Sequence, residues 1–126
     1  MPTTIGNIAI NVSDLERSER FYVDVLGLEL LHRIDTPEVV ELIVGSSTGG
    51  SQLILAHHPD GEPVRAGGGL WKVFVSTDDV QGLFRRATDA GAEAVTEPFR
   101  LEQFGVTLAF VHDPDGHLIE LGQQHS

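Results

Sequence analysis

An internal repeat constrains the fold of this chain more than any other feature, because one succession of segments occurs twice within 126 residues. In each half an alternating segment leads to an aspartate that begins a helix, Asp14 or Asp79, and the helix ends at a glycine, Gly27 or Gly91. Glycine suits that end because it adopts the left-handed conformation without steric cost. Short apolar segments with strand character follow each glycine. The chain is therefore predicted to contain two β-α-β-β-β modules.

The module boundaries follow from the same patterns. The first module is expected at about residues 5–58 and the second at about 70–122, within a single domain of residues 1–126. Between them, residues 58–69 are rich in glycine and proline and are predicted to form a connector. Ser13 and Glu16 fit a capping box at the start of the first helix. Strands are expected at residues 5–12, 28–33, 39–44, 52–57, 70–75, 94–96, 106–111 and 118–121.

Composition excludes several classes of function. The formal net charge of −11 disfavours nucleic acids and anionic membranes as partners. The chain contains no cysteine, so disulfides, thiolate metal sites and cysteine nucleophiles are excluded. Its apolar runs are too short to cross a bilayer, and the first residues lack the pattern of a signal peptide. A cytoplasmic location is the expectation.

A hairpin near the end of the chain carries the most unusual side chain. Asp113-Pro114-Asp115-Gly116 has turn chemistry and separates two apolar segments. Glu120 lies in the second of these segments and is its one carboxylate. A carboxylate on an apolar strand must be paired, bound to a cation or exposed.

The repeat aligns Glu120 with Ile54 and aligns Lys72, the one lysine of the chain, with Asn7. Side chains alternate along a strand, so Lys72 and Glu120 are predicted to share the face opposite the helix and to form an ion pair. Asn7 and Asn11 add polar groups to that face, which makes it too polar for a sealed core. Phe74 and Leu118 are expected on the same face as apolar walls. Trp71 should face away, toward a helix or a dimer partner.

Two segments carry a resemblance to a known family. Val12-Ser13-Asp14-Leu15-Glu16-Arg17-Ser18, continuing to Phe21-Tyr22 and Val25-Leu26-Gly27-Leu28, and Asp113-Pro114-Asp115-Gly116-His117-Leu118-Ile119-Glu120-Leu121 resemble the vicinal oxygen chelate superfamily. That superfamily holds glyoxalase I, extradiol dioxygenases and bleomycin-resistance proteins, and the first segment is most similar to glyoxalase I. The resemblance implies an α+β fold of two βαβββ modules that form a cupped mixed sheet with the helices outside. It also implies a homodimer and a small-molecule ligand.

The resemblance also implies where a metal would be bound. The ligand positions of the metalloenzymes correspond to Asn7, Ile54, Lys72 and Glu120, and Glu120 alone keeps a ligand type. An ammonium group offers no lone pair, and its charge repels a divalent cation. We therefore predict no metal cofactor, and a divalent cation, if one binds, would lie at Glu120. Asn11 stands where glyoxalase I has a glutathione-binding arginine, which argues against glutathione as a ligand.

Three functions remain open from the sequence. The first is a metal-free protein that binds a small molecule in a dimeric cup. The second is a metal-independent lyase or isomerase, in which Glu120 is the base and Lys72 the acid or electrostatic stabiliser. The third is a metal-dependent enzyme of glyoxalase I type with relocated ligands. Glu120 and Lys72 are the candidate catalytic residues, and the candidate ligand contacts are Asn7, Asn11, Ile54, Lys72, Phe74, Leu118 and Glu120.

Overall fold

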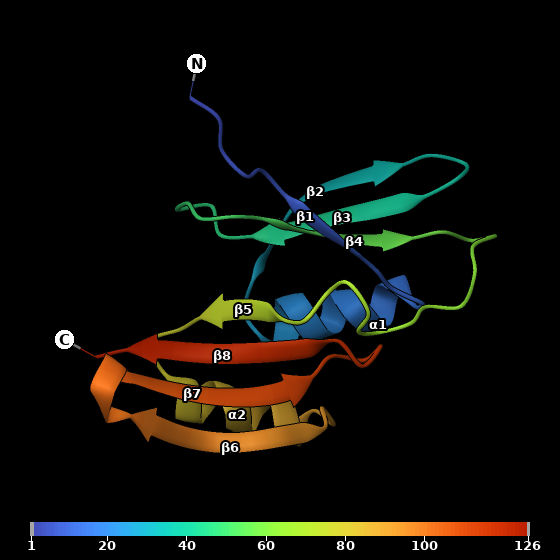
Figure 1. Ribbon diagram of the computed structural model, residues 1–126. Coiled ribbons are helices and arrows are strands. Elements are labelled where there is room, and N and C mark those ends of the chain that lie inside the picture. Colours follow the sequence, from blue (N-terminus) through green and yellow to red (C-terminus); the bar gives the residue numbers. More distant parts are fainter. Residues whose placement is uncertain (1, 126) are drawn as a thin grey trace. The chain divides into compact units, whose positions relative to one another are not determined.

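The computed structural model describes residues 2–125 and divides the chain into two compact units, with Val64 ending the first and Arg65 beginning the second. Each unit repeats the same order of strands with one α-helix after the first strand, as Figure 1 shows. The first unit contains β1 (Ile8–Asn11), α1 (Leu15–Glu19), the π-helical segment η1 (Arg20–Val25), β2 (Glu29–Asp35), β3 (Val40–Gly45) and β4 (Leu53–His57). The second contains β5 (Val73–Ser76), α2 (Val80–Asp89), β6 (Ala94–Leu101), the 3₁₀ segment η2 (Glu102–Phe104), β7 (Val106–His112) and β8 (Leu118–Gln124). The predicted β-α-β-β-β repeat is confirmed.

Each unit forms a four-stranded mixed sheet, in the order β1-β4-β3-β2 or β5-β8-β7-β6. The first and last strands of each unit pair in parallel, and the other pairs are antiparallel. In the first unit Ala9 is the partner of Ile54, and in the second Phe74 is the partner of Glu120. Asn7 and Lys72 each lie two residues before those partners. The register therefore confirms that Asn7 matches Lys72 and that Ile54 matches Glu120.

One face of the second sheet packs against α2, and the other face does not. Figure 1 shows α2 behind the sheet, and α2 contacts β6, β7 and β8. Side chains that alternate along β7 and β8 supply this core together with one side of the helix. They are Thr107, Ala109, Val111, Ile119 and Leu121 from the strands and Val80, Leu83 and Ala87 from α2. The opposite face is left to carry the candidate site.

The two helical segments differ in length by one residue, and a π-helical turn absorbs the difference. Asp14 and Gly27 bracket the first segment, and Asp79 and Gly91 bracket the second; both glycines have positive φ. In the first, the N–H of Leu26 donates to the carbonyl of Phe21, five residues earlier. Such i→i+5 bonds accommodate one extra residue in a helix. Both predicted glycine ends are confirmed.

Asp14, not Ser13, caps the first helix, so the capping box placed the cap one residue too early. The Asp14 carboxylate accepts from the backbone N–H of Arg17 at 3.1 Å. Ser13 instead accepts from the Arg17 guanidinium at 2.9 Å. A charged cap also interacts favourably with the positive end of the helix dipole, which favours aspartate over serine at this position.

Four predicted strands have a limit that differs by three residues or more in the structure, and one of them, β8, continues to Gln124, beyond the predicted end at Leu121. β1 and β5 begin at Ile8 and Val73, so Asn7 and Lys72 precede their strands. β6 continues to Leu101, beyond the predicted end at Thr96. Pro98 suggests a strand end in the sequence, but β6 is an edge strand with an irregular register between Thr96 and Phe99. An edge strand tolerates proline because the missing N–H is not needed for pairing. Within the described residues, no helix is long and apolar enough to span a membrane.

Replacing Asp79 with alanine should destabilise the second unit by about 1 kcal/mol, the usual loss on removing an N-cap side chain. Asp79 accepts from the N–H of Gly82 at 3.0 Å and begins the helix that covers the sheet. Urea unfolding followed by circular dichroism measures the change. Asp78→Ala is the matched control, because it removes the same charge from an exposed neighbour. An equal loss in both variants would show that charge, not capping, is responsible.

Candidate functional site

A tight hairpin positions the strand that carries Glu120. Its turn follows Asp113, whose carboxylate accepts from the N–H of Asp115 at 2.9 Å and of His117 at 2.8 Å. Gly116 has a φ of 90°, which a glycine adopts without strain. These contacts confirm the predicted turn. They fix the register of β7 on β8, in which Phe110 is the partner of Glu120.

Lys72 and Glu120 form an ion pair on the sheet face opposite α2. Nζ of Lys72 contacts Oε1 of Glu120, and the side chains are 25% and 7% exposed. The predicted pair is therefore present. Oε1 is buried and charge-paired, yet it accepts no hydrogen bond of good geometry from the described residues. The carboxylate keeps unused acceptor capacity, since an ionised carboxylate offers about four lone-pair sites.

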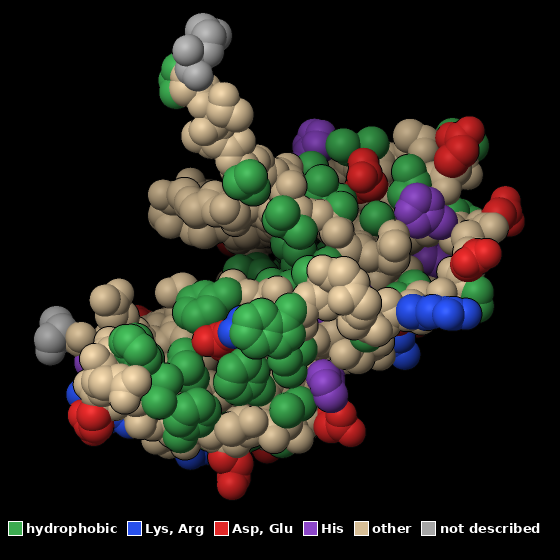
Figure 2. Space-filling view, in the orientation of Figure 1, with side chains coloured by type: hydrophobic (Ala, Val, Ile, Leu, Met, Phe, Trp, Pro, Cys, Tyr) green, Lys and Arg blue, Asp and Glu red, His purple; other side chains and the backbone are tan. Residues whose placement is uncertain are grey.

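Two aromatic rings flank the ammonium group of Lys72. Nζ lies 3.8 Å from the ring centroid of Trp71 and 5.7 Å from that of Phe110. Trp71 is 74% exposed. The prediction that it turns away from the pair is wrong, because residues 71 and 72 precede β5 and do not follow strand alternation. Figure 2 shows hydrophobic side chains gathered around one acidic and one basic group on this face.

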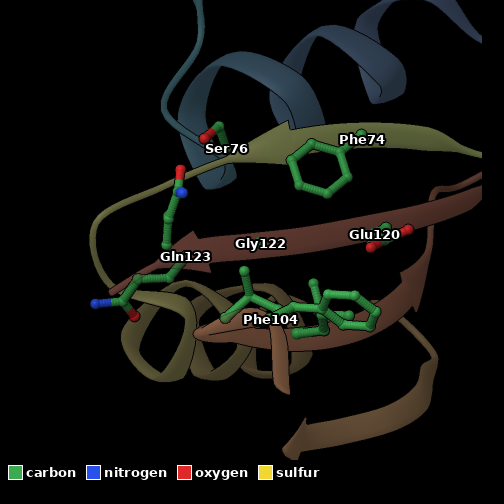
Figure 3. Close-up of a pocket in the computed structure, with 9 residues that line it drawn as sticks. Phe74, Ser76, Phe104, Glu120, Gly122 and Gln123 are labelled. Carbon is green, nitrogen blue, oxygen red and sulfur yellow. The ribbon is translucent and has the colours of Figure 1, made fainter. Parts of the chain in front are cut away.

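An open pocket of about 270 Å³ lies on the same face of the second unit (Figure 3). Glu120 is the one charged side chain among the described residues that line it. The lining residues are Phe74, Ser76, Phe104, Val106, Leu108, Glu120, Gly122, Gln123 and Gln124. Apolar walls with a few polar groups are typical of small-molecule sites.

Gly122 makes room for the aromatic wall of the pocket. A Cβ placed on this residue would lie 3.0 Å from Cε2 of Phe74 and closer still to Cζ. Figure 3 shows the ring of Phe74 reaching from β5 over β8. The ring therefore occupies the space that a side chain at position 122 would need.

The structure brings some predicted site residues together and not others. Phe74 and Glu120 line the pocket, and Lys72 contacts Glu120 without lining it. Leu118 is paired with His112 at the start of β8 and is absent from the lining. The remaining predicted contacts belong to the first unit. Asn7 directly precedes β1, Asn11 ends β1, and Ile54 lies in β4, which pairs with β1.

Sequence reasoning missed several pocket residues. Val106 and Leu108 alternate with the buried residues of β7, so the period of this strand could have identified them. Gly122 lies on the same side of β8 as Glu120, so strand alternation could have identified it as well. Phe104 belongs to the 3₁₀ segment η2, whose side-chain directions no strand or helix period indicates.

The family model of the Glyoxalase/Bleomycin resistance protein/Dioxygenase superfamily matches residues 4–121. The chain belongs to this superfamily. A lactoylglutathione lyase of Neisseria meningitidis serogroup A is 34% identical over 121 residues, covering 93% of this chain and 88% of that protein. A probable lactoylglutathione lyase of Synechocystis sp. is 31% identical, covering 93% and 92%.

Solved structures of superfamily members share the fold. Glyoxalase I from Zea mays superposes with a TM-score of 0.81 at 24% identity; the match covers 94% of this chain and 43% of the maize chain. TnmS3, an antibiotic-binding protein from Streptomyces sp. CB03234, gives a TM-score of 0.76 at 26% identity and covers 99% of both chains. The predicted superfamily and fold class are thereby confirmed.

The side chains present at the superfamily's implied metal positions do not fit a divalent cation. Among residues 2–125, no three His, Cys, Asp or Glu side chains form a group that could hold a metal ion. In the second unit the ammonium of Lys72 contacts Oε1 of Glu120 and so occupies the oxygen that a metal ion would need as a ligand. Ile54, at the position in the first unit that matches Glu120, has no donor atom. Catalytic zinc typically has three protein ligands, and these positions supply one carboxylate and one amide.

Proposed function

We propose that this superfamily member binds a small molecule without a metal, in the pocket that Glu120 and Phe74 line. The observation that carries the proposal is a largely buried ion pair, with Glu120 7% and Lys72 25% exposed, at the edge of an open apolar pocket. A buried pair adds little net stability over apolar packing, so stability alone explains it poorly. TnmS3, which matches along the full length of both chains, is an antibiotic-binding protein and supports the same reading.

The proposal extends to assembly and location. We propose a homodimer, in which a second copy completes the cup, and a cytoplasmic location. Large aromatic side chains remain exposed in the second unit, including Phe74 at 57% and Phe104 at 65%. Contiguous exposed apolar surface is commonly a site of association or ligand binding.

A lyase or isomerase is the second candidate, because relatives named lactoylglutathione lyase match more than nine tenths of the chain. In that case Glu120 would take a proton from the carbon next to a carbonyl group. The ammonium of Lys72 would then stabilise negative charge developing on the carbonyl oxygen. General acid–base and electrostatic catalysis both need such groups positioned within hydrogen-bond reach of the substrate.

A ligand screen by native mass spectrometry, with and without EDTA, tests the proposal. Binding should survive EDTA and should weaken roughly tenfold or more in Phe74→Ala, since the ring supplies one wall of the pocket. Phe99→Ala is the matched control, because Phe99 is also an exposed aromatic residue but lies outside the pocket. Loss of all binding after EDTA would contradict the metal-free proposal. Turnover of lactoylglutathione that Glu120→Gln abolishes would establish the second candidate instead.

A further inference from the structure

We infer that the pocket of the second unit selects its ligand by charge: it takes a small apolar molecule that carries a protonated amine and disfavours carboxylates. This inference rests on the proposed function, since it names the ligand class of the same pocket. It begins from the chemistry of the lining. Glu120 supplies the one charge among the described lining residues, and no lysine, arginine or histidine lies among them.

Lys72 neutralises Glu120 without presenting its own charge to the pocket. Its ammonium contacts Oε1 and lies over the ring of Trp71, and Lys72 is not part of the lining. A ligand in the pocket therefore meets the carboxylate and not the ammonium. Because the carboxylate is the end of the pair that lines the pocket, the pair favours a cationic ligand there over an anionic one.

The carboxylate also keeps acceptor capacity beyond its contact with Lys72. The ammonium contacts Oε1, and an ionised carboxylate offers about four lone-pair sites. An ionised carboxylate is acceptor-only, and a charge-assisted N⁺–H···O⁻ bond is about twice as strong as a neutral one. An amine on the ligand would add a second charge-assisted donor to the one that Lys72 supplies.

The other lining residues give little to a carboxylate ligand. An incoming carboxylate needs N–H or O–H donors, and the side chains that offer them are Ser76, Gln123 and Gln124. The amide oxygen of Gln123 already accepts from the N–H of Val80 at 3.1 Å, which fixes that side chain at the start of α2. None of the described lining residues carries a positive charge.

The apolar walls set the size and shape of the ligand. Phe74, Phe104 and Leu108 contribute apolar surface, and aromatic faces also attract cations. A pocket of about 270 Å³ lies below the roughly 300–1,000 Å³ of most small-molecule sites. One ring with a short amine side chain is the size that fits. The net charge of −11 adds a long-range attraction for cations.

Three probes of one shape and different charge test the inference: 2-phenylethylamine, 2-phenylethanol and 3-phenylpropionate. Each is titrated into the ¹⁵N-labelled protein, and the amide signals of Gly122 and Gln124 report binding in the pocket. We expect the amine to bind roughly tenfold more tightly than the alcohol, and the carboxylate to bind most weakly. In Glu120→Gln the preference for the amine over the alcohol should disappear, whereas Glu102→Gln, which removes an exposed carboxylate, should keep it.

The outcomes separate this inference from the proposed function. Equal affinities for the three probes, or tightest binding of the carboxylate, would overturn the charge selectivity and leave the pocket as a binding site. If no probe shifts the signals of Gly122 and Gln124, both the inferred ligand class and the proposed binding pocket are wrong. The order of affinities in the unmodified protein decides the question even if Glu120→Gln does not fold.

Discussion

Replacing Lys72 with alanine is expected to destabilise the protein by about 2–3 kcal/mol, because Glu120 would be left buried without a cation. Glu120 is 7% exposed, so water would solvate its carboxylate poorly in place of the ammonium. Loss of one partner of a fully buried pair costs roughly 3–5 kcal/mol, and the 25% exposure of Lys72 places this pair below that range. Urea unfolding at pH 7 measures the free energy of unfolding directly.

Three variants separate the charge from the packing of the lysine stem. Lys72→Met keeps much of the stem and removes the ammonium, so it should lose nearly as much stability as Lys72→Ala. In a Glu120→Gln background the buried charge is gone, and Lys72→Ala should then cost less than about 1 kcal/mol. Arg100→Ala breaks an exposed pair with Glu102 in the same unit and should cost less than about 1 kcal/mol. A loss for Lys72→Ala that is the same in both backgrounds would rule out the ion pair as its cause.

Much of the fold could be predicted because its signals are local and occur twice. Asp79 and Gly91 mark the limits of α2 through the chemistry of one side chain and of one backbone conformation. The alignment of Lys72 with Asn7 needed no more than residue counting from the helix starts, and the register of the parallel strands confirms it. The pairing of Lys72 with Glu120 was predicted from strand alternation and is present, although Lys72 itself precedes β5.

The wrong predictions concern residues at the ends of helices and strands, where strand alternation and helix periodicity no longer apply. Lys72 precedes β5, so alternation could not place its neighbour Trp71, whose ring lies over the ammonium. Asp14 replaced Ser13 as the cap because two adjacent residues could both fill that position. The strand predicted at residues 94–96 was too short, since β6 continues through Pro98 to Leu101 at the edge of its sheet, and edge position is a property of the assembled sheet.

The pocket itself depends on a contact between residues far apart in the sequence. Phe74 and Gly122 are separated by most of the second module, and their contact exists because β5 pairs with β8. Neither residue alone indicates a pocket. A phenylalanine on a strand predicts packing, and a glycine in a strand predicts a bulge or a close approach.

Replacing Gly122 with alanine is expected to weaken ligand binding roughly tenfold while changing the free energy of unfolding by less than about 1 kcal/mol. The added methyl group would lie 3.0 Å from Cε2 and 3.2 Å from Cε1 of Phe74. The ring is the far end of a flexible side chain that is 57% exposed, so it can move at low cost in stability. Its movement displaces the wall that it forms, and the pocket changes shape. Titration with 2-phenylethylamine, together with urea unfolding, measures both quantities.

A double-mutant cycle shows whether the effect passes through Phe74. In a Phe74→Ala background the ring is absent, and Gly122→Ala should then have no further effect on affinity. Gly69→Ala is the matched control, because a Cβ there meets nothing within 4 Å and the residue lies outside the pocket. If Gly122→Ala weakens binding equally with and without the ring, position 122 contacts the ligand itself and does not act by placing Phe74. If it changes binding in neither background, the wall that Phe74 forms has no part in recognition.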